Sequence, residues 1–473
     1  PPLATTAPPA TVPTAPLLLP VLLSLALGLG LWGLRRHGSL WRDEVVTYDM
    51  AHRNLPDLWG TLGNVDAVHG LYYLLMHALY TVFDDTDPLL VMRLPSVLAT
   101  AAATAGVVLL GRRLASPGAG LLAGFAFALL PLVQQHAQEG RSYALVCALV
   151  VWATYLLVWA VATRTTTLWC GYGTLLLAAG LLHEFAVLAL AAHALAVPRA
   201  TRRRWALTAA PVVVGLAPLA VLSTRQSEQV GWIGYDIVAY VTFAGLTALA
   251  LACARVLPRS SGPRTVDLST LALCLFITPT ALLLLMSVLQ PLYVDRYVLY
   301  GDAGLALLIG AAMHRLGRRR WIRIAAAATV LALIPTTLDL RDSASRVDNV
   351  TSIAGTIEQL GEPGHGVLYM PLRRRVWSLP YPNAVSGLRD LALDQSPVAS
   401  RTLYGTEVPA PVIRSRMLET PRIVAVRDPA GQPEDAIAQE AVKREVLVAH
   451  FEECRTREVR GARVTVFARP GDC

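Results

Sequence analysis

The chain has 473 residues, of which 54% are hydrophobic and only 16% are charged, and its mean hydropathy is +0.48. These values exclude a soluble enzyme and are typical of a polytopic membrane protein. The net charge of +8 comes from arginines in short loops between apolar stretches, not from one basic stripe. Such loops mark membrane topology, so we expect membrane lipids as partners and no nucleic acid.

The composition changes twice along the chain. Residues 1–16 are rich in Pro, Ala and Thr and carry no charge, which predicts a disordered N-terminus. Apolar stretches then recur over 17–340, whereas residues 341–473 contain ordinary amounts of charge, Pro and Gly. We therefore expect a transmembrane domain over 17–340, with its first span retained and not cleaved, and a small α/β domain over 341–473.

The apolar stretches predict about eleven transmembrane helices. If the N-terminus is cytoplasmic, the arginine-rich loops at 112–113, 164, 199–204, 255–264 and 315–323 all lie inside, and the C-terminal domain lies on the extracytoplasmic side. Only Arg35 and Arg36 disagree with this orientation, because they would lie outside. The segments 168–182 and 184–197 are short for a bilayer and predict an angled or re-entrant pair. The predicted spans are 17–32, 88–111, 118–135, 141–163, 168–182, 184–197, 205–223, 236–255, 266–289, 297–314 and 322–340.

In this orientation, polar and ionisable residues near the ends of spans gather on the outer face, many of them in or next to a first outer loop of about 35–87. Ionisable groups at membrane depth are energetically costly, so such a gathering indicates a functional site. The candidates are Asp43, Glu44, Asp66, His69, Tyr73, Arg93, Glu139, Arg141, His183, Glu184, Tyr293, Arg296 and Tyr297.

Asp43 and Glu44 directly follow the first span. Asp43 is a candidate general base that takes a proton from a hydroxyl group. The alternative is a solvated carboxylate paired with Arg42. If the segment is helical, Glu44 faces another direction and either holds Asp43 or binds the acceptor.

The segment from Asp66 to His77 has helical spacing that places His69, Tyr73 and His77 on one stripe, with Asp66 one turn earlier. These residues suit either a metal ion or a phosphate and a sugar hydroxyl. The candidate metal ligands are Asp43, Asp66 and His69, and a divalent cation is the one cofactor left open. The alternative is an amphipathic helix at the level of the lipid headgroups.

Arg93, Arg141 and Arg296 each lie at the outer end of a predicted span. Guanidinium groups bind phosphate through charge-assisted bonds, which predicts a phosphorylated lipid as a partner. The alternative is that each arginine anchors its helix at the membrane interface.

The C-terminal domain has apolar segments at 367–370, 422–426, 446–449 and 462–468 and helical patterns around 353–360 and 434–444, which predict a small α/β unit. The segment Trp377 to Gly387 either covers the mouth of the site or packs within the domain. Cys454 and Cys473 are expected either to form a disulfide, as an extracytoplasmic location permits, or to remain free thiols.

Together, these motifs resemble those of the GT-C glycosyltransferases, in particular the glycosyltransferase family 39-like bacterial relatives of protein O-mannosyltransferases and of the aminoarabinose transferase acting on lipid A. The resemblance covers only 17–340. The segments that carry it are Trp41 to Glu44, Asp66 to His77, Arg93 to Ser96, Gln138 to Leu145, His183 to Phe185 and Pro291 to Tyr297.

The resemblance implies a GT-C fold and the inverting transfer of a mannose-like or pentose sugar from a polyprenyl-phosphate donor to a glycan, lipid or protein on the extracytoplasmic side. It gives Asp43 the role of general base and places donor phosphate at Arg296 and Arg93. Two departures leave the acceptor and metal use open. Glu184 follows His183 where relatives often have an aromatic residue, and His69-Gly70 replaces a Pro-rich version of that loop.

Two further observations bear on the class of protein. Lys443 is the only lysine, which together with the heavy use of Ala, Leu and Arg is typical of GC-rich bacterial coding and predicts a bacterial plasma membrane. The competing function is a non-enzymatic flippase or transporter of lipid-linked sugars. Transporters usually have related halves, and the chain has no convincing internal repeat, so the transferase is favoured.

Overall fold

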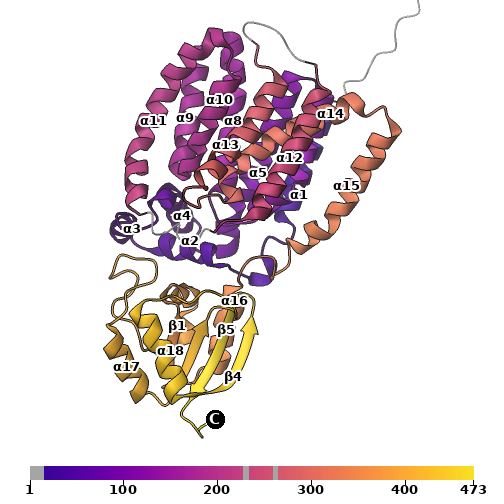
Figure 1. Ribbon diagram of the computed structural model, residues 1–473. Helices are drawn as coiled ribbons and strands as arrows, with labels where there is room; N and C mark the ends of the chain where they lie inside the picture. The colour runs from indigo at the N-terminus through magenta and orange to yellow at the C-terminus, as the bar shows by residue number, and fades with distance from the viewer. Residues whose placement is uncertain (1–14, 227–233, 259–264) are drawn as a thin grey trace, which may run out of the picture.

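The computed structural model describes residues 15–226, 234–258 and 265–473, so most of the predicted disordered N-terminus lies outside the described residues. A bundle of apolar helices forms one end of the molecule, and an α/β domain forms the other (Figure 1). Three short helices lie between them: α2 (Arg42–His52), α3 (Leu55–Leu62) and α4 (Gly70–Val82). These three helices belong to the first outer loop predicted from the sequence.

Within the described ranges, eight helices are long and apolar enough to cross a membrane, and the bent pair α6 and α7 makes a ninth if it is one span. With the two shorter apolar helices α9 and α10, each of the eleven predicted apolar segments is helical, and the chain is a multi-pass membrane protein. The bundle helices are α1 (Ala15–Leu31), α5 (Pro88–Leu114), α6 (Pro117–Leu129), α7 (Pro131–Ala137), α8 (Tyr143–Thr163), α9 (Thr166–Leu182), α10 (Leu188–Ala196), α11 (Arg202–Arg225), α12 (Ile237–Arg255), α13 (Leu268–Met286), α14 (Asp302–Leu316) and α15 (Arg320–Asp339).

Local sequence explains where several bundle helices begin. Asp87 caps α5 by accepting a hydrogen bond from the Leu89 amide at 2.8 Å, and a proline follows at the first helical position. Ser116 caps α6 in the same way through the Ala119 amide at 3.2 Å. Pro131 then separates α6 from α7, and the two helices meet at an angle of 66°. The sequence predicted a single span over 118–135, and the structure bends it at this proline.

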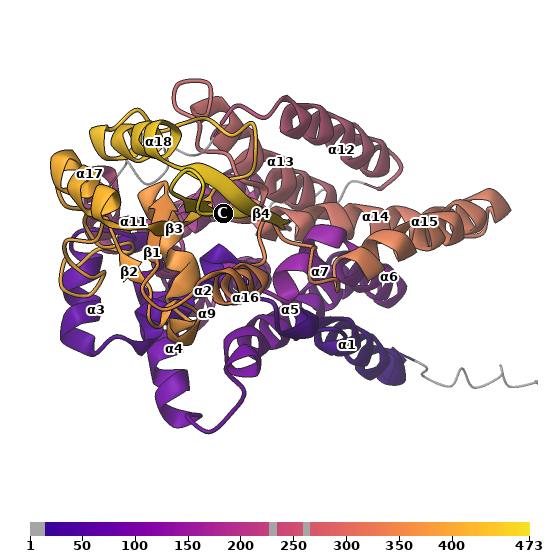
Figure 2. The same cartoon turned by 90° about the horizontal axis from the view of Figure 1, so that it is seen from below.

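Small residues allow the central helices to pack backbone against backbone. A Cβ atom at Gly120 of α6 would lie 2.3 Å from the Val108 carbonyl oxygen of α5, and one at Gly310 of α14 would lie 2.2 Å from the Ala123 amide nitrogen of α6. In contrast, α15 has no buried residue and stands away from the bundle in both views (Figures 1 and 2). An apolar helix without protein cover is suited to contact with lipid.

The C-terminal domain is built on a five-stranded sheet with the order β2-β1-β3-β5-β4. The strands β1, β2 and β3 are parallel, and β5 is antiparallel to both β3 and β4. The elements are α16 (Val350–Leu360), β1 (Gly366–Met370), β2 (Arg389–Asp390), α17 (Ala410–Glu419), β3 (Arg422–Arg427), α18 (Ala438–His450), β4 (Glu452–Val459) and β5 (Ala462–Ala468).

This arrangement confirms the predicted α/β unit but corrects two of its details. The apolar segment 446–449 was predicted as a strand, and it is the last part of α18, where Val446 and Leu447 are buried against the sheet. The charged sequence of β4 gave no strand signal because β4 is an exposed edge strand. Cys454 of β4 is joined to Cys473 by a disulfide, which is one of the two alternatives considered from the sequence.

Candidate active site

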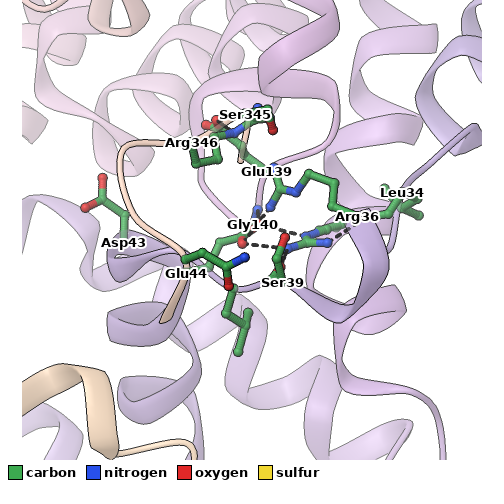
Figure 3. Close-up of polar contacts among 12 residues, drawn as sticks. Leu34, Arg36, Ser39, Asp43, Glu44, Glu139, Gly140, Ser345 and Arg346 are labelled. Atoms are coloured by element: carbon green, nitrogen blue, oxygen red, sulfur yellow. Dashed lines mark hydrogen bonds and ion pairs between the residues drawn. The ribbon is translucent and has the colours of Figure 1, made fainter. Parts of the chain in front are cut away.

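The two carboxylates at the start of α2 point in different directions (Figure 3). The side chain of Glu44 is fully buried, whereas that of Asp43 is 20% exposed. Successive residues of a helix are rotated by about 100° about its axis, so one face of α2 is buried against the bundle while the neighbouring face stays open. The structure therefore separates the adjacent acids into two environments.

Glu44 is enclosed by two buried arginines. Arg93 donates from Nε and Nη2 to the two carboxylate oxygens at 2.8 and 2.7 Å, and Arg36 donates from Nη2 at 2.8 Å. The Gly140 amide adds a fourth bond at 3.1 Å. Burial alone would raise the pKa of Glu44, but these donors outweigh it and lower the pKa. Glu44 is therefore a charged group that holds the surrounding loops together.

Glu139 extends this buried network toward the C-terminal domain. Its carboxylate contacts His136 Nδ1 and Arg346 Nε, both at 2.7 Å. Burial raises the pKa of Glu139, but His136 and Arg346 outweigh it and lower the pKa below its usual range. The sequence predicted that Glu44 belongs to the catalytic pair and either holds Asp43 or binds the acceptor, and it predicted contacts with substrate for Arg93 and Glu139. In this arrangement their charged atoms are already paired inside the protein.

Asp43 faces a different set of side chains. Its Oδ2 lies 3.4 Å from Nη2 of Arg296, and its Oδ1 lies 3.7 Å from Nε of Arg42. Arg296 belongs to the 3₁₀ segment Asp295–Gly301 before α14, and its Nε donates to the Tyr143 hydroxyl at 3.1 Å. Residues 253 positions apart thus meet at one point.

Aromatic rings surround the Arg296 guanidinium. Its Cζ lies 5.9 Å from the ring of Trp41, 5.5 Å from that of Tyr143 and 5.9 Å from that of Tyr297. Rings at these distances attract a cation and hold it in place. Trp41 and Tyr143 lie within the motifs of the predicted site but were not among its candidate residues.

Arg141 is a second buried guanidinium of the site and is only 5% exposed. Its Nη1 donates to the Asp43 carbonyl oxygen at 3.4 Å and to the hydroxyls of Thr47 and Tyr73, both at 3.3 Å. These three oxygens are neutral, and no carboxylate among the described residues forms a direct ion pair with Arg141 of the kind that holds Arg93. A buried cation in this state favours the binding of an anion.

Asp66 is linked to Arg141 through the Tyr73 hydroxyl. Its backbone is left-handed, with a φ of 61°, and Tyr73 donates a short hydrogen bond to its carboxylate. Burial raises the pKa of Asp66, while Arg141 opposes this increase. The predicted neighbours Asp66 and His69 are close, with 4.0 Å between Asp66 Oδ1 and His69 Nε2.

His69 and His183 face each other with 5.5 Å between their ring centroids. The Nδ1 atoms of both rings are buried and have no hydrogen-bond partner among the described residues. Burial, together with the charges of Arg141 and Arg296, lowers the pKa of His183 to about 3 and that of His69 well below its usual value. Both imidazoles are therefore neutral near pH 7.

The remaining predicted residues lie at the edge of this arrangement. Tyr297 contacts His183 with 4.5 Å between ring centroids, so it belongs to the site. Glu184 accepts a hydrogen bond from the Ser223 hydroxyl at 2.7 Å, and the Tyr293 amide donates to the Ser287 hydroxyl at 2.8 Å. We use the term "Asp43 cluster" for the residues that the structure brings together: Asp43, Asp66, His69, Tyr73, Arg141, Tyr143, His183, Arg296 and Tyr297.

The described part of the chain contains no group of three or more His, Cys, Asp or Glu side chains arranged to hold a metal ion. Asp66 and His69 form a neighbouring pair, while Asp43 faces Arg296. The divalent cation considered from the sequence thus stays a prediction.

Comparison with known proteins places this geometry in context. The family described as dolichyl-phosphate-mannose-protein mannosyltransferase matches residues 70–226, a range that contains Arg93, Arg141 and His183. No curated protein matches the sequence.

Two solved structures resemble the whole chain. Apo ArnT from Cupriavidus metallidurans is 12% identical with a TM-score of 0.59, covering 96% of this chain and 98% of that one. ArnT from the same organism bound to undecaprenyl phosphate is 13% identical with a TM-score of 0.57, covering 95% and 97%. These likenesses show the fold. The predicted fold, a polytopic helical membrane domain followed by a small α/β domain, is confirmed, and the family match and the likeness to ArnT agree with the resemblance drawn from the sequence.

Proposed function

We propose that the protein is an inverting glycosyltransferase that moves a mannose-like or pentose sugar from a polyprenyl-phosphate donor to a hydroxyl group of an extracytoplasmic glycan, lipid or protein. The observation that carries this proposal is the meeting of one accessible carboxylate, Asp43, with two guanidinium groups, Arg141 and Arg296, beside the ends of membrane helices. A base and a phosphate site within a few ångströms of each other are the two groups that such a transfer requires.

The reaction is a single displacement. The oxygen of the acceptor hydroxyl attacks the anomeric carbon of the donor sugar while Asp43 takes the proton of that hydroxyl. The bond between the anomeric carbon and the phosphate oxygen breaks. The lipid phosphate leaves with the bonding electron pair, and Arg141 and Arg296 stabilise its charge. A phosphate is a good leaving group at neutral pH, so a general acid is not required.

Four lines of support come together here. Arg141 makes its bonds to neutral oxygens and is ready to take an anion. The neutral imidazoles of His69 and His183 have unpartnered Nδ1 atoms that suit sugar hydroxyls. The matching family is described by its lipid-phosphate mannose chemistry, and ArnT has the same fold and was solved with undecaprenyl phosphate. The arginine-rich loops on the opposite side of the bundle favour an extracytoplasmic site.

The test uses the full chain in lipid vesicles with radiolabelled undecaprenyl-phosphate mannose and undecaprenyl-phosphate arabinose as probes, with bacterial membranes as the source of acceptor. We expect label to move from at least one donor to acceptor or, more slowly, to water. Label that crosses the vesicle membrane while it stays on the lipid would contradict the proposal and would support a flippase.

A further inference from the structure

The C-terminal domain contains a cavity of about 380 Å³ between α18 and the face of the sheet against which α18 packs. This volume lies within the range of about 300–1,000 Å³ that is typical of small-molecule sites. Met370 and Arg427, which line the cavity, are the last residues of the parallel strands β1 and β3. The region beyond the carboxyl ends of parallel strands is where ligands commonly bind in α/β domains.

Two arginines of this cavity lie directly opposite each other on neighbouring strands. Arg427 of β3 is paired in register with Arg463 of β5, so both side chains leave the same face of the sheet. Like charges in this arrangement repel and destabilise the pair of strands. The Nε atoms of both arginines are buried and have no hydrogen-bond partner in the described parts of the chain. A bound anion would offset the repulsion and accept from these donors.

The acidic residues of the cavity do not neutralise Arg463. Each of the five carboxylates that line the cavity is paired with a different basic side chain: Asp428 with Arg374, Glu434 with Arg444, Asp435 with Arg373, Glu440 with Lys443 and Glu453 with Arg427. Within the described ranges, the Arg463 side chain forms no hydrogen bond or ion pair, not even with Glu458, its neighbour on β4. The cavity therefore holds one guanidinium group without a carboxylate partner.

The opposite wall of the cavity is apolar and is formed by Met370, Leu447, Phe451 and Phe467. A sugar ring has apolar C–H faces that suit such a wall, and its hydroxyl groups can donate to the carboxylates of the rim. An inorganic anion would use only the arginines, and a fatty acid would offer no donor to the carboxylates. The lining thus suits a sugar that also carries a carboxylate or phosphate group.

The cavity lies beside the contact between the two domains. Asp428 of the cavity pairs with Arg374 in the 3₁₀ segment Leu372–Ser378, and this segment contacts α2, the helix that carries Asp43. We infer that the cavity binds the acidic group and the ring of an anionic saccharide, and that it thereby holds an anionic acceptor glycan beside the transferase site. The acceptor role rests on the proposed glycosyl transfer, whereas the binding of the saccharide does not.

The segment Trp377 to Gly387, considered from the sequence as a cover for the site or a packing loop, does not line this cavity. The Trp377 side chain is fully buried in the domain, and the Tyr381 hydroxyl is bonded to Thr351 at 2.7 Å. The packing alternative describes this segment.

The binding test uses the full-length protein in detergent and calorimetric titration with four probes: glucuronate, glucose 6-phosphate, glucose and inorganic phosphate. We expect the two acidic sugars to bind at least about tenfold more tightly than glucose or inorganic phosphate. Arg463→Gln should weaken binding of the acidic sugars about 10- to 100-fold, as loss of a charged hydrogen-bond donor does. The matched control is Arg455→Gln, which removes the same charge from an exposed position of β4 outside the cavity and should leave binding unchanged.

Thermal unfolding without ligand separates a binding role of Arg463 from a structural one. Arg463→Gln removes a charge that repels Arg427, so its unfolding temperature should be no lower than that of the wild type. A lower unfolding temperature together with weaker binding would assign Arg463 to the fold and overturn the inference. Equal binding of glucose and glucuronate, equal binding of inorganic phosphate and glucose 6-phosphate, no binding at all, or no effect of Arg463→Gln would overturn it as well.

The acceptor role is tested by sugar transfer in vesicles with bacterial membranes as the source of acceptor. Arg463→Gln should raise the amount of acceptor needed for half-maximal transfer about tenfold, and Arg455→Gln should not change it. If Arg463→Gln weakens saccharide binding but leaves this amount unchanged, the cavity binds saccharide and its acceptor role is wrong. If the wild type binds acidic sugars but transfers sugar neither to acceptor nor to water, the proposed function fails together with the acceptor role, while the saccharide site stands.

Discussion

Replacement of each member of the acidic pair by its amide gives a sharp test of the site, because Asp43→Asn and Glu44→Gln change the same charge at adjacent positions. The structure predicts opposite phenotypes. Asp43→Asn should abolish transfer and leave the fold intact, whereas Glu44→Gln should destabilise the fold.

The expected size of the Asp43 effect follows from its proposed role. Loss of a general base lowers a rate by about 100- to 10,000-fold. Asparagine preserves the volume of the side chain and its contact with Arg296, at 3.4 Å in the wild type. It also removes a negative charge beside the proposed phosphate site, so binding of undecaprenyl phosphate should be as tight as in the wild type or tighter.

The expected size of the Glu44 effect follows from its burial. Glu44→Gln leaves Arg36 and Arg93 buried without a counterion, and breaking a buried ion pair in this way costs about 3–5 kcal/mol. The neutral amide also offers one acceptor oxygen where the carboxylate uses two. We expect a clearly lower unfolding temperature in detergent, with activity lost in proportion to the folded fraction.

The assay pairs three measurements on each variant: sugar transfer, undecaprenyl phosphate binding and thermal unfolding in one detergent. Asp43→Asn that transfers sugar within tenfold of the wild-type rate would refute the base assignment. A stable Glu44→Gln protein that binds lipid but does not transfer sugar would assign the base to the other acid of the pair.

Three other expectations follow from the cluster. Arg141→Gln should weaken undecaprenyl phosphate binding about 10- to 100-fold, as loss of a charged hydrogen-bond donor does, and unchanged binding measured by titration would contradict its proposed role. In the unfolded chain His183 binds a proton below about pH 6.5, whereas in the folded protein its pKa is about 3 and it stays neutral. As the pH falls from 6.5 to 3, the wild type should therefore lose stability relative to His183→Phe, by at most about 1.4 kcal/mol per pH unit. Thermal unfolding that depends on pH equally in both proteins would argue against a buried neutral imidazole. Two guanidinium groups already supply positive charge for the phosphate, so transfer should survive chelation by EDTA; a loss that Mg²⁺ or Mn²⁺ restores would instead support the cation considered from the sequence.

Much of the Asp43 cluster was predictable, because residues can be assigned to one side of the membrane from the lengths of the apolar segments and the positions of the arginines alone. This reasoning put Asp43, Arg141 and Arg296 on one face, and the structure brings them together. It could not tell Asp43 from Glu44 or Arg141 from Arg93. Adjacent residues of a helix have the same hydropathy context, and only tertiary packing decides which side chain is enclosed.

The C-terminal domain shows a second limit of sequence reasoning. The Thr402 carbonyl accepts a hydrogen bond from Arg53 at the C-terminal end of α2 at 3.0 Å, yet the two residues lie 349 positions apart, so neither pattern nor spacing connects them. The edge strand β4 is hidden for a related reason, because its charged residues are tolerated where one side of the strand faces solvent. Both features depend on contacts between segments distant in the chain, which local patterns do not encode.

The arginines predicted to lie on the outer face gain a physical explanation once their partners are known. Arg35 and Arg36 conflict with the rule that basic residues stay inside, yet Arg35 pairs with Asp87 at 2.7 Å and Arg36 pairs with Glu44. A paired arginine carries little net charge to the outer side, so the conflict is small. Arg141 differs, because it donates to neutral oxygens and, among the described residues, forms no direct ion pair with a carboxylate. Burial of such a charge costs stability unless an anion joins it. These arginines therefore divide into a set whose ion pairs stabilise the fold and a set that we propose binds a ligand. The phosphate of a lipid carrier is the anion that we expect at the ends of the membrane helices.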